Sequence, residues 1–172
     1  MKDILTQSEL IQLRRTTAAD LDFVVQAEDA GDNRTFVGQW SRQKHLLALV
    51  DRHIAHLVIE TIPENQFVGY IIVTDLIDPN LSLNLKRIVI VQKGQGYGHA
   101  ALHLLKKVAF EQWQAHRLWL DVKDFNQRAR HLYEAEGFVV EGMLRECLKV
   151  GDNFESLVIM SVLQSEYQKV SS

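Results

Sequence analysis

The stretch "VQKGQGYGHAAL", from Val91 to Leu102, carries glycines at positions 94, 96 and 98 between an apolar run and a helix-like pattern. Glycine weakens regular elements, so three alternating glycines indicate that the backbone turns sharply or lies against a ligand. Backbone N–H groups at a strand-to-helix junction can point at an anion, and the helix dipole adds to that attraction. The stretch therefore predicts a phosphate- or diphosphate-binding loop, with a plain tight turn as the alternative.

The segment before this loop reads as a strand whose pattern changes part-way along. Apolar and polar residues alternate over 81–85, whereas 88–91 are all apolar. Because side chains alternate between the two faces of a strand, burial changes here from one-sided to two-sided. A β-bulge near 86–88 would produce this change and free backbone groups for other partners. A strand that runs from a sheet edge into the interior is the alternative.

The segments around the loop predict the topology. A helix over 97–112 is followed by a strand over 117–122, and strand, helix and strand in succession imply a right-handed crossover and a parallel pair. Strands at 53–60 and 67–76 are joined by a short turn, which indicates antiparallel pairing. We therefore expect an α+β fold: one domain over residues 1–172, with a mixed, mostly antiparallel sheet and flanking helices. Other expected elements are a strand at 10–14, helices starting at Thr17, Ser41 and Asn126, and a closing hairpin formed by 138–150 and 154–163.

The composition restricts the class of function. The 172 residues have a formal net charge of -3, whereas nucleic-acid-binding domains are usually basic. No apolar run approaches the roughly 18 residues of a membrane span, and the first ten residues lack a signal-peptide core. The single cysteine, Cys147, excludes a disulfide framework within the chain. We expect a cytoplasmic protein with neither nucleic acid nor membrane as its partner.

Two other nucleotide-binding motifs compete for the glycine loop. A Walker loop is excluded because no Gly-Lys-Ser/Thr follows at the required spacing. A dinucleotide fold is a stronger rival, since Gly96, Gly98 and Ala101 match G-x-G-x-x-A and Asp121 ends the next strand. Two polar residues separate the strand from the glycines, however, and too few residues follow to build two mononucleotide halves. An NAD(P)-dependent oxidoreductase remains the alternative function.

Two motifs in order resemble one family. "KGQGYG" (93–98) resembles the diphosphate loop of the GNAT superfamily of acyl-CoA-dependent N-acyltransferases. "NQRARHLYEAEGF" (126–138) resembles that family's second motif, Asn-x-x-Ala-x-x-Leu-Tyr-x-x-x-Gly-Phe. The chain end is similar to the branch that contains ribosomal-protein N-terminal and spermidine acetyltransferases. The resemblance covers essentially the whole chain and is strongest over 82–163.

The resemblance implies acetyl-CoA as cosubstrate, with its pantetheine arm between two splayed parallel strands, 82–91 and 117–122. His99 and His103 have the i, i+4 spacing of a metal pair, but the Glu of H-E-x-x-H is absent, so no metal is expected. The residues to which the resemblance assigns cofactor binding are Ile88, Val89, Ile90, Lys93, Gly94, Gln95, Gly96, Tyr97, Gly98, His99 and Asn126.

The chemistry of acetyl transfer to a primary amine needs an acid and a base. The amine must lose its proton before it attacks the thioester, and the leaving thiolate must be protonated or hydrogen-bonded. The resemblance assigns the acid to Tyr133. Many relatives carry a Glu where this chain has Asn84, so the base is open among Asp121, Asp75 and a water chain, with Asp121 the residue we carry forward.

The acceptor side is less defined in the sequence. Glu28 and Trp40, which follow the first predicted helix, are the candidate acceptor-binding residues. A small-molecule amine or a protein N-terminus fits the resemblance, and a homodimer is compatible with it. Because Asn84 replaces a carboxylate, a non-catalytic acyl-CoA-binding module is a second alternative.

Overall fold

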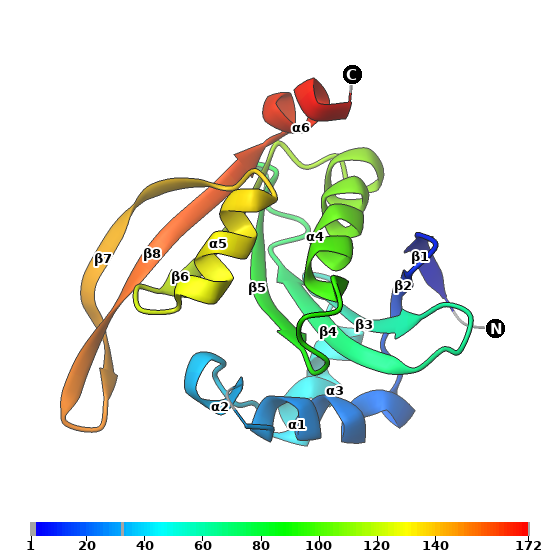
Figure 1. The fold of residues 1–172 in the computed structure, drawn as a ribbon, viewed down its shortest axis with the longest axis horizontal. Coiled ribbons are helices and arrows are strands. Elements are labelled where there is room, and N and C mark those ends of the chain that lie inside the picture. The colour runs from blue at the N-terminus through cyan, green and yellow to red at the C-terminus, as the bar shows by residue number, and fades with distance from the viewer. Residues whose placement is uncertain (1–2, 32, 172) are drawn as a thin grey trace.

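The computed structural model describes residues 3–31 and 33–171, which form one eight-stranded sheet with helices against both faces (Figure 1). The strand order is β1-β2-β3-β4-β5-β6-β8-β7, and every neighbouring pair is antiparallel except β5 and β6. The strands are β1 (Ile4–Gln7), β2 (Ile11–Arg15), β3 (Ala55–Thr61), β4 (Phe67–Thr74), β5 (Ser82–Ile90), β6 (Arg117–Lys123), β7 (Val139–Val150) and β8 (Asn153–Leu163). The helices are η1 (Ala18–Asp20), α1 (Leu21–Asp29), α2 (Asn33–Phe36), α3 (Arg42–Val50), α4 (Tyr97–Lys107), η2 (Val108–Gln112), α5 (Gln127–Ala135) and α6 (Gln164–Ser171).

Each face of the sheet has its own apolar core. On one face, α4 and the α5 segment bury leucines and Tyr133 against side chains of β2 to β6 and β8. On the other face, α1 packs Leu21, Val24 and Ala27 against Val58, Tyr70 and neighbouring residues of β3 to β5, with α3 beside it. The two layers of helices fix which residues of the central strands are buried.

The central strands β5 and β6 part after a short parallel ladder. Residues 82–84 pair with 117–119, and the ladder does not continue along 85–90. The β4–β5 register shifts where Ile72 faces Arg87 and Val73 faces Leu85, which leaves Lys86 as the extra residue of a bulge. Both the splayed pair and the bulge near 86–88 were expected from the sequence, and both expectations are confirmed.

Helix starts and ends follow the expected local signals. The Ser41 side chain accepts a hydrogen bond from Lys44 N, and the Asn126 side chain accepts one from Ala129 N, so each caps its helix. Gly137 ends α5 with a φ of 88°. Near Thr17, whose backbone N–H donates to Asp20, the chain first forms the 3₁₀ turn η1 and then α1. The helix expected over 97–112 ends as the π-helical turn η2.

β7, the outer strand of the last hairpin, is exposed along most of its length. The turn end of the hairpin extends away from the helices (Figure 1), and Val139, Val140, Met143 and Leu144 of β7 are each about half exposed. Within the described residues, no helix has the length and apolar character needed to cross a membrane. The hairpin is therefore the main apolar surface outside the two cores.

Candidate active site

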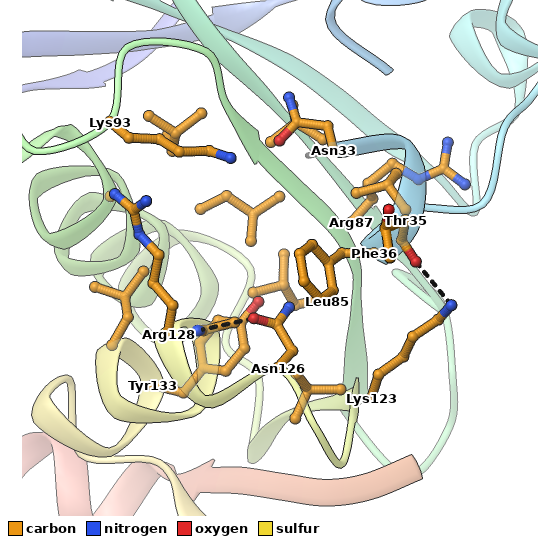
Figure 2. A pocket seen from close by; sticks show the side chains of 18 of the residues that line it. Asn33, Thr35, Phe36, Leu85, Arg87, Lys93, Lys123, Asn126, Arg128 and Tyr133 are labelled. Carbon is orange, nitrogen blue, oxygen red and sulfur yellow. Dashed lines mark hydrogen bonds between the residues drawn. The ribbon is translucent and has the colours of Figure 1, made fainter. Parts of the chain in front are cut away.

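The gap between β5 and β6 opens into a cavity of about 1420 Å³. Its walls are the unpaired part of β5, the glycine loop after it, the start of α5, and the α2 segment across from them. Figure 2 shows side chains from these elements converging, with Lys93, Arg128, Tyr133 and Phe36 on different sides of one space. The cavity thus lies where the sheet lacks a ladder and the loop meets a helix start.

The glycine loop forms the N-terminal end of α4. Gly94 has a φ of 80° and Gly96 has a φ of 79°, in the left-handed region that disfavours side chains. Gly96 is the N-cap of α4, and a Cβ added there or at Gly94 would meet no atom within 4 Å. The loop therefore borders open space with helix N–H groups behind it, which is the geometry of an anion site.

We expect Gly96→Val to weaken acetyl-CoA binding by about tenfold or more while costing only about 1–2 kcal/mol of folding stability from backbone strain. The reason is that the new side chain enters the open space in front of α4. The measurement is the melting-temperature shift across an acetyl-CoA titration. Gly151→Val is the matched control, because Gly151 also has a positive φ of 60° but lies in the β7–β8 turn. Equal affinity in the two variants would refute the loop assignment.

The start of α5 supplies the second wall. Asn126 caps this helix and lines the cavity. Tyr133 lies further along the same helix and also lines the cavity. Tyr133 is 8% exposed, and burial together with the nearby Asp121 charge raises the pKa of its phenol. The phenol therefore keeps its proton at neutral pH and can donate it.

Arg128 is a cavity residue that the sequence reasoning missed. It lies at the exposed start of α5, and its side chain runs back across the cavity toward Lys93 (Figure 2). Two cationic side chains thus face the glycine loop region from two elements. The family motif leaves this position unspecified, so only the direction of the α5 wall could have indicated it.

Asp121 lies on the opposite face of the sheet from the α4 core. Leu118, Leu120 and Val122 of β6 are buried in that core, so the alternating residue Asp121 points to the other face. It is exposed and lines the cavity. Tyr133 and Asp121 both line the cavity, the phenol from the α4 side of the sheet and the carboxylate from the other side.

Asn84 lies at the last rung of the parallel ladder, opposite Trp119. It is buried, and its Oδ1 has no hydrogen-bond partner among the described residues. The alternative base Asp75 lines a separate, smaller cavity with Trp119 and His53. Among the described residues that line the large cavity, Asp121 is the single carboxylate.

The α2 segment is held over the cavity by two contacts to the β6–α5 connection. Lys123 Nζ donates to the Thr35 carbonyl at 2.8 Å (Figure 2), and the rings of Phe36 and Phe125 lie 5.8 Å apart. Lys123 also pairs with Glu155 at 2.8 Å. These contacts join a segment that precedes β3 to one that follows β6, and they place Phe36 in the cavity.

Trp40 lines the cavity behind α2, but its ring already has cationic neighbours. Lys44 Nζ lies 4.3 Å from the ring centroid and Arg87 Cζ lies 4.9 Å from it. Arg87 is itself buried. The indole is therefore part of a packed wall as well as a cavity surface.

Glu28 lies behind this wall and does not line the cavity. It is 1% exposed, and its Oε1 accepts hydrogen bonds from Arg87 and from the Tyr70 hydroxyl. Its Oε2 accepts the Trp40 backbone N–H at 2.9 Å. Burial alone would raise the pKa of this carboxyl, but His45, these hydrogen bonds and the Arg87 charge lower it overall. We therefore assign Glu28 a supporting position.

Two buried histidines complete the Glu28 network. His45 Nε2 lies 3.0 Å from Glu28, its Nδ1 lies 3.0 Å from His56 Nε2, and His56 Nδ1 lies 2.9 Å from the Thr16 hydroxyl. Burial lowers the pKa of His56 to about 3, so this ring is neutral. A neutral His56 ring carries one N–H, so it donates to only one of its two neighbours, His45 or Thr16.

The cavity brings together most of the residues that the sequence predicted. Gln95, on the exposed outer side of the loop, and Glu28 are the two that do not line it. His99 pairs with Glu136 at 2.9 Å, and no cluster of three or more metal-ligating side chains occurs in the described residues. The predicted residues that line the cavity are Trp40, Ile88, Val89, Ile90, Lys93, Gly94, Gly96, Tyr97, Gly98, His99, Asp121, Asn126 and Tyr133.

The chain is similar to known acetyltransferases in sequence and in structure. Residues 28–138 match the sequence model of the Acetyltransferase (GNAT) family. The chain is 25% identical over 168 residues to spermidine N(1)-acetyltransferase of Vibrio cholerae serotype O1, an alignment that covers 91% of this chain and 95% of the relative. A mutant form of the Vibrio cholerae spermidine/spermine N-acetyltransferase SpeG has the same fold, with a TM-score of 0.84, 23% identity and coverage of 96% of this chain and 100% of that one. A dodecameric structure of the Vibrio cholerae enzyme gives a TM-score of 0.82 at 23% identity, with the same coverage.

Proposed function

The chain belongs to the GNAT family of acetyltransferases and uses acetyl-CoA to acetylate an amine, and from this premise we propose that its acceptor is the primary amino group of a small molecule. The observation that carries the proposal is the gap between β5 and β6, with Tyr133 on one side and Asp121 on the other. The contacts of α2 with Lys123 at the end of β6 and with Phe125 after it place α2 over the acceptor side, which favours a small molecule over a folded protein's N-terminus.

The cavity fits acetyl-CoA in shape and charge. The open space in front of Gly94 and Gly96 faces the N-terminus of α4, and Lys93 and Arg128 supply positive charge beside it. Beyond Asn84, the edge of β5 that faces the gap lacks a strand partner, so its backbone groups are available to the amides of a pantetheine arm. When bound, acetyl-CoA supplies a thioester whose carbonyl carbon accepts the amine nitrogen.

The acid and base steps fall to residues on the two sides of the gap. Asp121 takes a proton from the acceptor's ammonium group, which leaves the nitrogen lone pair free to form the C–N bond. A backbone N–H on the unpaired edge of β5 donates to the developing oxyanion. Tyr133 donates its proton to the departing sulfur as the C–S bond breaks, and the phenolate then takes the extra proton of the new amide nitrogen. The exposed carboxylate of Asp121 releases its proton to solvent.

The basic side chains on the acceptor side do not exclude an ammonium group. Arg87 is paired with Glu28, Lys123 with Glu155, and Arg34 with Asp29. These three positive charges are therefore balanced locally, and the unpaired carboxylate of Asp121 attracts the reacting amine.

The test is coenzyme A thiol release with acetyl-CoA and a panel of acceptors. The panel contains 2-phenylethylamine, butylamine, spermidine (because the Vibrio cholerae relative is named for it) and a peptide with a free N-terminus. We expect thiol release with small amines and little with the peptide. If acetyl-CoA raises the melting temperature but no amine gives thiol, the chain is a binding module. A melting-temperature shift with NADH and none with acetyl-CoA would instead favour the oxidoreductase alternative.

We further propose that the chain self-associates through the β7–β8 hairpin. The exposed apolar side chains of β7 form a surface suited to a second copy, and the Vibrio cholerae relative is described as dodecameric. We expect light scattering to give a mass above that of one chain, and Leu144→Glu to reduce it. A monomer at the highest soluble concentration would contradict the proposal.

A further inference from the structure

We propose that the acceptor is a monoamine with an apolar body, and that Phe36 is the residue that selects it. This inference rests on the proposed small-molecule acetyltransferase function and narrows its substrate class. Phe36 is 36% exposed, yet it does not project into solvent alone: Figure 2 shows it extending from α2 into the cavity, toward the side of Asn126 and Tyr133.

The surroundings of Phe36 form an apolar wall. Phe125, which is 46% exposed, lies across from it at 5.8 Å between ring centroids with a tilt of 42°. Leu148 of β7 and Leu157 of β8 line the same cavity and are half-buried. Exposed aromatic pairs lose favourable burial unless something covers them, and an apolar group between these side chains would supply that burial.

The apolar wall lies on the acceptor side of the cavity and not on the cofactor side. The glycine loop, Lys93 and Arg128 lie across the cavity from α2 (Figure 2). Leu157 pairs with Lys123 in the β6–β8 ladder, while Ile159 pairs with Asp121 one step along the same face. The proposed base is thus next to the apolar wall, so an amine that reaches Asp121 places its own carbon skeleton against that wall.

The charges of the cavity argue for a single ammonium group. Asp121 is the one carboxylate that lines the cavity within the described residues, and it is used by the reacting nitrogen. A second ammonium group on the acceptor would approach Lys44 or Lys86 without a free carboxylate to pair with. An acceptor with one amine and an alkyl or aryl group meets no such repulsion.

The experiment compares 2-phenylethylamine with spermidine as acceptors, in the wild type and in Phe36→Ala. We expect the wild type to have a higher kcat/KM for 2-phenylethylamine than for spermidine. Phe36→Ala should reduce kcat/KM for 2-phenylethylamine by about tenfold, mainly through KM, because an apolar contact of this size gives discrimination of that order. Phe36→Leu should recover part of the loss. The kcat/KM for spermidine should change by less than about twofold.

Two controls separate this inference from folding and from the proposed function. Phe154→Ala removes a more exposed phenylalanine at the hairpin tip and should leave both kcat/KM values unchanged. The acetyl-CoA-induced melting shift should be the same in Phe36→Ala and the wild type. If spermidine is the better acceptor, or if Phe36→Ala leaves the ratio of the two amines unchanged, the inference is overturned while the acetyltransferase function stands. If no amine of the panel gives thiol in the wild type, the proposed function itself fails.

Discussion

Replacing Tyr133 by phenylalanine is expected to lower kcat by about 10²–10⁴-fold, the usual contribution of a positioned acid, with acetyl-CoA affinity unchanged. The substitution removes one hydroxyl from a side chain that is 8% exposed and keeps the ring that packs at 5.8 Å from Phe138. Burial and the Asp121 charge raise the pKa of the phenol, so the wild-type group stays protonated through neutral and mildly alkaline pH. Steady-state thiol release and calorimetric binding of acetyl-CoA measure the two quantities separately.

Tyr167→Phe provides the matched control for this substitution. Tyr167 donates to Glu111 and stacks on Phe110, outside the cavity. Loss of the Tyr167 hydroxyl should leave kcat within about twofold of the wild type, since Glu111 and Phe110 do not line the cavity. Unchanged turnover in Tyr133→Phe would remove the acid role from this residue, and loss of acetyl-CoA binding would reassign it to the cofactor wall.

Glu28→Ala is expected to destabilise the fold by about 3–5 kcal/mol, because it leaves the buried Arg87 guanidinium without its carboxylate. The same change removes the acceptor for the Trp40 backbone N–H and the Tyr70 hydroxyl. For a chain of this size the loss corresponds to a fall in melting temperature of roughly 6–20 °C. Urea unfolding followed by circular dichroism measures the free energy directly.

The neighbouring Asp29→Ala is the control, because Asp29 pairs with Arg34 at 3.4 Å on the surface with both side chains more than 60% exposed. Exposed pairs of this kind contribute about 0–1 kcal/mol. Since the folded-state pKa of Glu28 is lowered, its stabilisation is present above the ordinary glutamate pKa and is lost as the pH falls through the folded value. If the two variants had equal free energies of unfolding at neutral pH, the Glu28 network would not stabilise the fold.

Features set by local sequence could be predicted. The bulge at Lys86 follows from a change in alternation within one strand. The caps at Ser41 and Asn126 follow from side chains that bond the backbone a few residues away. For the bulge and the caps, the cause and the effect lie within one element, so the sequence contains the whole signal. The splayed pair was expected from the resemblance to the family.

Features set by contacts between distant segments could not be predicted. Glu28 was expected beside the acceptor, but its partners Tyr70 and Arg87 come from strands 42 and 59 residues away, and they draw it into the core. The short helix α2 has no periodic pattern, and its place depends on Lys123 and Phe125. The terminal elements β1 and α6 were also missed, because short segments depend on what they pack against.

The brief parallel ladder has a further consequence for how the molecule is held together. The five strands β1 to β5 and the three strands β6, β8 and β7 form two half-sheets that share only the rungs at 82–84 and 117–119. A pantetheine arm along the open seam would supply the missing rungs. Bound cosubstrate would then join the two half-sheets as well as supply the acetyl group.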